Sequence, residues 1–205
     1  MLFEVWLSFV LVTIVVVLSP GPAVLLAVSR GAQFGVRRAA WAILGNVSGL
    51  AVLITASAIG VASVLAASSE WLFWLRIIGG GYLVYLGLRL LLSKAQPALN
   101  LGGERALPSR RKSYLQGVAV ALSNPKALLF IGALFPQFLN PAAPVAEQLA
   151  ILGVTLMVLS FLALIVYAAL SKALVHAGRD RLYGKINRIT GGLFVLFGVA
   201  LASGR

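Results

Sequence analysis

The chain has 205 residues, of which 60% are hydrophobic and only 11% are charged, whereas soluble domains average about 45–50% and 25%. A soluble protein of this length could not bury so much apolar surface. The 17 Lys and Arg residues outnumber the 5 Asp and Glu residues, which gives a net charge of +12. These charges cluster between long uncharged stretches instead of covering a polar surface, as they do in nucleic-acid-binding proteins. The composition indicates an integral membrane protein whose partner is the lipid bilayer and not nucleic acid.

The Cys and His content also limits the chemistry that this protein can perform. The chain has no Cys and a single His, His176, which excludes disulfides, thiolate nucleophiles, iron–sulfur clusters, multi-His metal sites and bis-His haem. No Ser–His–Asp set, metal cluster or pair of carboxylates falls at the expected membrane depth, which disfavours an intramembrane enzyme. We therefore expect no cofactor, no metal and no catalytic residue.

Six apolar segments follow one another along the chain, and a spanning helix needs roughly 20 mostly apolar residues. The first lacks the basic start of a signal peptide and is too long for one, so we expect it to be a span. The last is short, which leaves open whether it spans fully. The pattern predicts an all-α membrane protein with six transmembrane helices, at residues 5–29, 39–69, 71–92, 114–138, 148–171 and 189–203.

The basic residues alternate between connections. Lys and Arg occur in the first, third and fifth connections, residues 30–38, 93–113 and 172–188, whereas the second and fourth contain only Glu70 and Glu147 as charged residues. Cytoplasmic loops of membrane proteins are enriched in Lys and Arg. The three basic connections are therefore predicted to be cytoplasmic and both termini to lie outside.

Two motifs occur twice, in the same order. Residues 18–23 (LSPGPA) correspond to residues 122–127 (LSNPKA), and residues 76–80 (RIIGG) correspond to residues 188–192 (RITGG). Chance matches are common in apolar sequence, but two matches in one order indicate an internal repeat.

The repeat divides the chain into a first three-helix half at residues 1–92, a cytoplasmic linker at 93–113 and a second three-helix half at 114–205. Because each half has an odd number of crossings, the second half must be inverted relative to the first. Inverted-topology repeats are the plan of many secondary transporters.

The first repeated motif places proline inside spans 1 and 4. Proline removes a helix hydrogen bond, and in lipid the freed backbone group needs protein or water to satisfy it. Each span is then predicted to be broken near the membrane centre, where the positive N-terminal ends of two half-helices can converge on a carboxylate. Simple proline kinks are the alternative, but matched positions in two repeats favour a site. The candidate substrate-binding residues are Ser19, Pro20, Gly21, Pro22, Ser123, Asn124, Pro125 and Lys126, with Asn124 expected to cap the half-helix that Pro125 begins.

Lys126 is a charged residue near the middle of a span, where a lysine costs about 2.5–3.5 kcal/mol or more. No Asp or Glu lies deep within any predicted span. Two roles remain open: its ammonium binds the carboxylate of the substrate, or it caps the free carbonyls that end the preceding half-helix, around residues 119–122, or snorkels toward the surface.

The second span contains the sequence GNVSG at residues 45–49. The spacing of Gly45 and Gly49 permits close helix contact, and packing alone explains these glycines. Asn46 between them is a further candidate substrate-binding residue, because a buried amide needs partners, which a ligand or the break in span 1 could supply.

The motifs together resemble a known family. They are residues 19–22 (SPGP), 35–39 (GVRRA), 45–49 (GNVSG), 80–87 (GGYLVYLG) and 123–127 (SNPKA) running on to 135–138 (FPQF). In this order, and over essentially the whole chain, the sequence is similar to the LysE/RhtB family of amino-acid exporters. The resemblance implies a bacterial inner-membrane exporter, an antiporter driven by the proton gradient, with amino acids or their derivatives and protons as its partners.

The sequence departs from the family pattern at Ala23, where many members carry a polar residue. The absence of a carboxylate deep in a span disfavours a cationic substrate and favours a neutral amino acid. A passive channel, which would need a continuous polar path, and a structural membrane protein are the alternatives. A homo-oligomer is compatible with the sequence, which does not identify the residue that couples to protons.

Overall fold

The computed structural model describes residues 1–65, 69–92, 107–171, 173 and 179–203. Within these ranges every element is helical and there is no strand, which confirms the all-α prediction for the described part of the chain. His176 and residues 93–106 of the predicted linker lie outside the described residues. The elements are α1 (Phe3–Leu18), α2 (Pro22–Phe34), α3 (Val36–Leu65), α4 (Ser69–Leu92), α5 (Arg110–Leu122), α6 (Pro125–Leu129), the π-helix η1 (Phe130–Leu134), the 3-10 helix η2 (Phe135–Phe138), α7 (Val145–Ala169) and α9 (Arg179–Ala202).

Within the described residues, five of the predicted spans lie on one helix or on helices joined at a bend, and the remaining one, 39–69, lies on α3 up to Leu65. Two helices are long and apolar enough to cross a membrane, Val36–Ser57 within α3 and Val145–Ala169, and the number rises to four if each of two bent pairs is one span. The apolar parts of α4 and α9 among the described residues, Ile77–Leu92 and Gly191–Ala200, are shorter. These helices make a multi-pass membrane protein, while the full set of six crossings and the inversion of the halves stay predictions.

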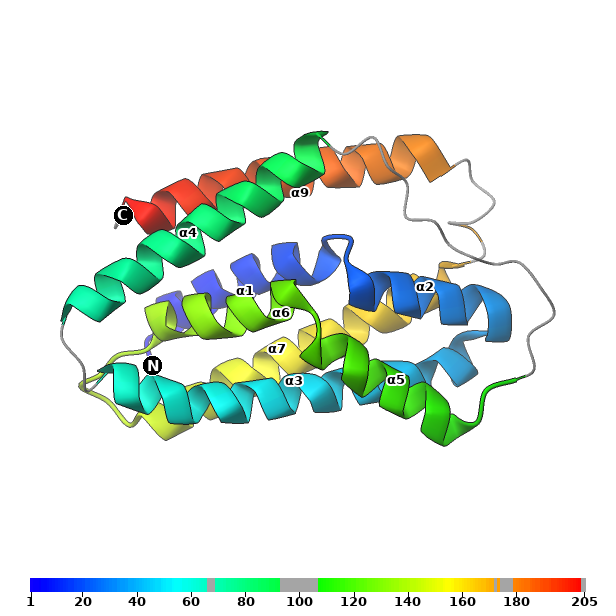
Figure 1. Ribbon diagram of the computed structural model, residues 1–205, viewed down its shortest axis with the longest axis horizontal. Helices are drawn as coiled ribbons and strands as arrows, with labels where there is room; N and C mark the ends of the chain where they lie inside the picture. The colour runs from blue at the N-terminus through cyan, green and yellow to red at the C-terminus, as the bar shows by residue number, and fades with distance from the viewer. Residues whose placement is uncertain (66–68, 93–106, 172, 174–178, 204–205) are drawn as a thin grey trace.

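The helices run roughly along the long axis of the molecule (Figure 1). Both ends of the chain lie at one end of the molecule, together with the end of α3 and the start of α4. The turn between α2 and α3 and the starts of α5 and α9 lie at the opposite end. This is the arrangement that an even number of passes produces.

The predicted connections are longer than the observed ones. Residues 30–38 are expected to form a loop, but α2 continues to Phe34 and α3 begins at Val36. Only Gly35 lies between them, with φ of 75°, a left-handed conformation that glycine adopts without steric cost. Its N–H donates to the carbonyl oxygen of Gly31 at 2.9 Å, which ends α2 without a loop.

The other two basic connections are also partly helical. Helix α5 begins at Arg110, capped by the hydroxyl of Ser109, which accepts the N–H of Lys112 at 3.2 Å. Helix α9 begins at Arg179, within the predicted loop 172–188. The predicted bounds of these loops are wrong because hydropathy identifies only the part of a helix that is suited to lipid. Arg and Lys are good helix formers, so a helix can continue through them beyond the membrane.

Glycines bring helices from opposite halves into close contact. A Cβ added at Gly80 would lie 2.6 Å from the carbonyl oxygen of Gly198, and one added at Gly87 would lie 2.6 Å from that of Gly191. These contacts join α4 to α9, which pack antiparallel on one side of the molecule (Figure 1). Each glycine therefore allows a backbone approach that any side chain would prevent.

The contact between α3 and α5 has the same basis. A Cβ at Gly45 would overlap the carbonyl of Tyr114, and one at Gly117 would overlap the carbonyl of Ala42. The predicted packing role of the glycine pair in α3 is confirmed, since a Cβ at Gly49 would lie 2.6 Å from that of Ala121. The two most extensive helix–helix interfaces, α4 with α9 and α3 with α5, thus join residues 1–92 to residues 114–205.

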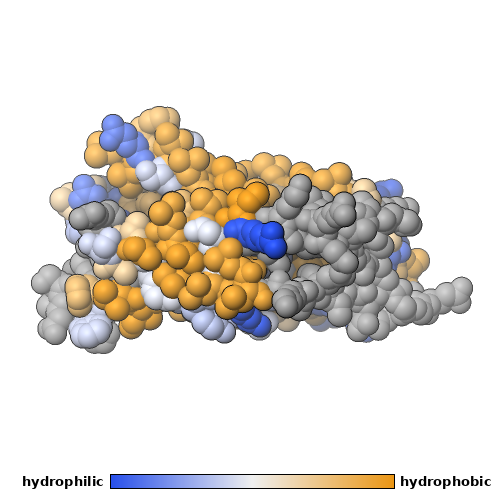
Figure 2. All heavy atoms as spheres, turned by 90° about the horizontal axis from the view of Figure 1, so that it is seen from above, coloured by the Kyte–Doolittle hydropathy of each residue, from blue (hydrophilic) through white to orange (hydrophobic). Residues whose placement is uncertain are grey.

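The interior and the outer surface are both apolar. A buried aromatic group formed by Phe9, Phe130 and Phe135 lies in the main core, with ring centroids 5.3–6.1 Å apart. On the side of α4 and α9, Figure 2 shows apolar side chains over most of the described surface. Its exposed members include Ile78, Leu88, Leu196 and Val199. Such a surface is suited to contact with lipid and not with water.

Candidate substrate site at two helix breaks

The first break separates α1 from α2, which are bent by 56°. Pro20 and Pro22 have no N–H, and Pro22 occupies the first turn of α2, where a proline is tolerated. The C-terminal carbonyls of α1 have both local and tertiary partners. The N–H of Ser19 donates to the carbonyls of Val15 and Val16, and its hydroxyl donates to that of Val16 at 2.7 Å. The hydroxyl of Tyr167 in α7 donates to the carbonyl of Leu18 at 2.7 Å, so a side chain from another helix helps to close the break.

The second break separates α5 from the helices after Pro125, with a bend of 51°. The predicted cap is confirmed: Asn124 Oδ1 accepts the N–H of Lys126 at 3.1 Å, and Pro125 begins α6. The α-helix expected to continue beyond this point ends at Leu129 and passes into η1 and η2. Pro136 explains the change, because it lacks an N–H and its ring clashes with the carbonyl four residues earlier.

Lys126 joins the two breaks. Its ammonium donates to the carbonyl oxygens of Val16 and Ser19, both at 2.9 Å, and to the hydroxyl of Ser19 at 2.8 Å. These three acceptors match the three N–H donors of a lysine ammonium. They also belong to the C-terminal end of α1, the negative end of its helix dipole, which stabilises a cation.

The predicted capping role of Lys126 is therefore correct in kind but wrong in its target. The carbonyls around residues 119–122 have local partners: Ala119 accepts the N–H and the hydroxyl of Ser123, and Ala121 accepts the N–H of Asn124. Lys126 instead binds the end of α1, in the other half of the chain. Binding of the substrate carboxylate by this ammonium stays a prediction.

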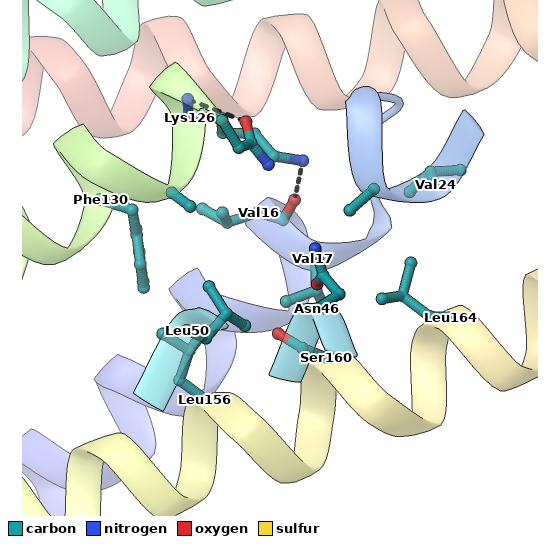
Figure 3. A pocket seen from close by; sticks show the side chains of 13 residues that line it. Val16, Val17, Val24, Asn46, Leu50, Lys126, Phe130, Leu156, Ser160 and Leu164 are labelled. Carbon is teal, nitrogen blue, oxygen red and sulfur yellow. Dashed lines mark hydrogen bonds between the residues drawn. The ribbon is translucent and has the colours of Figure 1, made fainter. Parts of the chain in front are cut away.

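A central cavity lies beside the first break, between α1, α2, α3, α6 and α7. Its empty volume is about 460 Å³, a figure that includes space open to the exterior. Figure 3 shows Lys126 bound to Val16 on one side of the cavity, and Asn46 and Ser160 on the other. The lining residues are Val16, Val17, Ala23, Val24, Asn46, Leu50, Asn124, Lys126, Ala127, Phe130, Leu156, Ser160 and Leu164.

Asn46 is a polar residue of this cavity with unused hydrogen-bonding capacity. Its side chain is 3% exposed, and its Nδ2 has no hydrogen-bond partner among the described residues. A buried donor without a partner is costly, so native proteins rarely keep one without a reason. The amide of Asn46 is therefore available to a ligand in the central cavity.

A second, smaller cavity lies on the other side of Lys126, against α4 and α9. Its empty volume is about 250 Å³, again including space open to the exterior, and it shares Val16, Lys126 and Phe130 with the central cavity. Tyr82 of α4 and Phe194 of α9 also line it. The link between Lys126 and α1 thus forms part of the wall between the two cavities.

The structure separates the predicted site residues into three groups. Asn46, Asn124 and Lys126 line the central cavity. Ser19 binds Lys126, and Gly21 lies against it, since an added Cβ would be 3.3 Å from the Nζ of Lys126.

The remaining predicted residues lie outside the cavity. Pro20, Pro22 and Pro125 shape the breaks, and Ser123 is exposed with its hydroxyl bonded within its own helix. Two polar side chains at the site were not predicted from the sequence. Ser160 lines the cavity, and Tyr167 binds the carbonyl of Leu18 at the first break. For Ser160 a signal exists, because it sits four residues from Leu156 and from Leu164 on the buried face of α7.

The two cavities contain few ionisable groups. No Asp or Glu lines either of them in the described part of the chain, and no group of three His, Asp or Glu that could hold a metal occurs there. A cavity beside paired helix breaks in a membrane protein is the arrangement found in secondary transporters. Fold and site thus define the class as a membrane transporter.

Sequence comparisons identify the family. Residues 14–205 match the family model described as LysE type translocator, so the chain belongs to this family and is a transporter and not an enzyme. It is 32% identical to the homoserine/homoserine lactone efflux protein of Salmonella typhi, over 100% of this chain and 99% of that protein. It is 30% identical to the leucine efflux protein of Salmonella choleraesuis, over 96% and 93%. An uncharacterized membrane protein of Vibrio cholerae is 30% identical over 98% of both. No solved structure gives a significant match.

Proposed function

We propose that this protein is a secondary exporter that moves neutral amino acids or their derivatives out of the cytoplasm in exchange for protons. Membership of the LysE type translocator family supports transport, and the relatives named for efflux support the outward direction. The observation that carries the proposal is the unpartnered amide of Asn46 in a cavity beside the start of α2.

The carboxylate of the substrate binds at the N-terminal end of α2. Gly21 precedes α2 without a side-chain cap, so the N–H groups of the first turn remain available. Ala23 and Val24 of this turn line the cavity, as does Asn46. The positive end of the helix dipole and the Nδ2 donor of Asn46 together favour an anionic group there. Lys126 adds a positive charge nearby while it stays bound to α1.

The side chain of the substrate is apolar or neutral. Beyond its few polar groups the cavity is lined by aliphatic residues, among them Leu50, Leu156 and Leu164. A cationic side chain would find no carboxylate partner among the described lining residues, and burying an unpaired charge is costly. Two relatives named for the efflux of homoserine or its lactone and of leucine point to the same class of solute.

Export proceeds by alternating access across the inner membrane of a bacterium. We propose six crossings in two inverted halves, with residues 30–38, 93–113 and 172–188 on the cytoplasmic side and both termini outside. The alternation of Lys and Arg between the connections supports this orientation. The halves move relative to each other about the two breaks, as in other transporters built from inverted repeats.

Proteoliposomes that contain the purified protein test the proposal. They are loaded with one labelled amino acid at a time, and its release is measured with and without an imposed pH gradient. We expect release of a neutral amino acid such as leucine or homoserine that saturates with concentration and accelerates with the gradient. Flux in both directions that does not saturate and ignores the gradient would indicate a channel, and no flux of any amino acid would contradict the substrate class.

A further inference from the structure

The ammonium of Lys126 occupies a site made entirely of oxygen atoms. Two of its acceptors are backbone carbonyls, of Val16 and Ser19, and the third is the Ser19 hydroxyl, all within 2.8–2.9 Å. Unwound carbonyls and the C-terminal ends of half-helices bind the coupling cation in many transporters with broken helices. Lys126 therefore supplies from one half of the chain a cation that fills such a site in the other half.

Among the described residues that line the two cavities, no carboxylate balances this charge. Of the groups that face Lys126 in the two cavities, α4 contributes the titratable Tyr82, and α1, α2, α3, α7 and α9 contribute no charged side chain among the described residues. Tyr167 of α7 is the other titratable group nearby, and its hydroxyl is bonded to the carbonyl of Leu18. The positive charge is thus held only by dipoles, an arrangement that can lose a proton without leaving a buried anion behind.

We propose that Lys126 carries the proton whose movement drives export. This inference rests on the proposed function, since it assigns a residue to its proton coupling. When Lys126 is protonated, its three N–H groups hold the C-terminal end of α1. On deprotonation one N–H bond breaks, its electron pair stays on Nζ, and the proton passes to water. The neutral amine keeps two donors for three acceptors and releases α1 in part. Reprotonation restores the link.

The position of this link suits such a role. Lys126 and Val16 line both cavities, so release of α1 opens the wall between the central cavity and the smaller cavity against α4 and α9. Gly21 keeps space free beside the Nζ of Lys126, because an added Cβ would approach it to 3.3 Å. A change of protonation at Lys126 is thereby converted into a change at the helix break that binds the substrate.

Two modes of transport in proteoliposomes separate coupling from binding. Accumulation against a concentration gradient, driven by a pH gradient, needs the coupled proton, whereas exchange of labelled for unlabelled substrate at equal pH needs only binding and movement. Lys126→Gln keeps neutral donors for the carbonyls of α1. We expect exchange to persist, weakened by the loss of the positive charge near the substrate carboxylate, while accumulation falls by roughly tenfold or more because the coupled proton is no longer carried. Lys112→Gln, at an exposed lysine of α5, is the matched control and should accumulate like the wild type.

A second variant leaves Lys126 in place. Ser19→Ala removes one acceptor of the ammonium and so favours the neutral amine. The pH at which accumulation is half-maximal should therefore move to lower values, while exchange persists.

Several results would overturn the inference. Accumulation by Lys126→Gln at the wild-type rate would do so, as would loss of both modes in folded Lys126→Gln or an unchanged pH profile in Ser19→Ala. Wild-type protein that exchanges an amino acid but ignores the pH gradient would refute the coupling. Wild-type protein that shows neither mode with any amino acid would instead refute the proposed function.

Discussion

The two helix breaks occupy matching positions in the repeated sequence motif, yet they are stabilised in different ways. At the second break, Asn124 caps the helix that follows, and Ser123 binds the carbonyl of Ala119 in the helix that precedes. At the first break, Gly21 offers no cap, and the end of α1 is bound by Ser19 in the same segment and by Tyr167 and Lys126 from other helices. The second break is closed by its own residues, whereas the first also uses tertiary partners and leaves the start of α2 without a cap. The two halves therefore differ at their breaks: the first presents an uncapped helix start and the carbonyls at the end of α1, and the second supplies the lysine that binds those carbonyls.

The largest expected effect comes from moving α5, the helix before the second break, away from α3. Gly117→Ala places a Cβ onto the carbonyl of Ala42, so α5 must move away from α3. Overpacking of this kind costs roughly 1–3 kcal/mol, and more where backbone is the obstacle. We expect loss of folded protein in detergent, measured by size-exclusion chromatography. Gly81→Ala is the control, because nothing lies within 4 Å of its added Cβ. Equal yields of the two variants would contradict the close packing.

The next prediction concerns Asn46, which lines the cavity beside the first break. Asn46→Leu removes the unpartnered donor from the central cavity. Substrate affinity should fall by roughly tenfold to a hundredfold, the range for a hydrogen bond to a charged group. The melting temperature should stay the same or rise, because an unsatisfied buried amide is lost. Binding of labelled leucine or homoserine and thermal unfolding measure the two quantities. A fall in stability with unchanged binding would make Asn46 structural.

A pair of variants compares the caps of the two breaks directly. Asn124→Ala removes the side-chain cap of α6 and should cost about 1 kcal/mol of stability. Gly21→Ala removes no cap, but its Cβ would lie 3.3 Å from the Nζ of Lys126, so it should disturb transport more than stability. Thermal unfolding and proteoliposome transport of both variants test the contrast. If Gly21→Ala is the less stable variant and transports normally, the two breaks do not differ as described.

The smallest effect concerns the support of α1 from α7. Tyr167→Phe removes the donor to the carbonyl of Leu18, a bond worth about 0.5–1.5 kcal/mol. We expect a slightly lower melting temperature and a modest loss of transport, since Lys126 still holds the neighbouring carbonyls of Val16 and Ser19. A transport loss as large as that of Asn46→Leu would show that Tyr167 has a more direct part in the site.

Local sequence signals predicted the breaks but not their connections. Proline chemistry and the repeat located both breaks, and the cap by Asn124 follows from residues adjacent in the chain. The partners of Lys126 could not be predicted, because Val16 and Ser19 meet it only through the packing of α6 against α1. The start of α9 at Arg179 was missed because hydropathy does not register polar helix ends. Ser160 was missed because its importance depends on which face of α7 is buried.

Substrate protection of a single cysteine is the most direct test of the central claim, that the cavity beside the first break holds the exported amino acid. The chain has no Cys, so Ser160→Cys introduces a unique thiol into the cavity lining. Ser8→Cys, on the exposed surface of α1, is the control. We predict that an amino acid exported by the wild type slows alkylation of Ser160→Cys in proteoliposomes and leaves the rate for Ser8→Cys unchanged. If every exported amino acid leaves the alkylation rate of Ser160→Cys unchanged, the substrate binds elsewhere and the account is wrong.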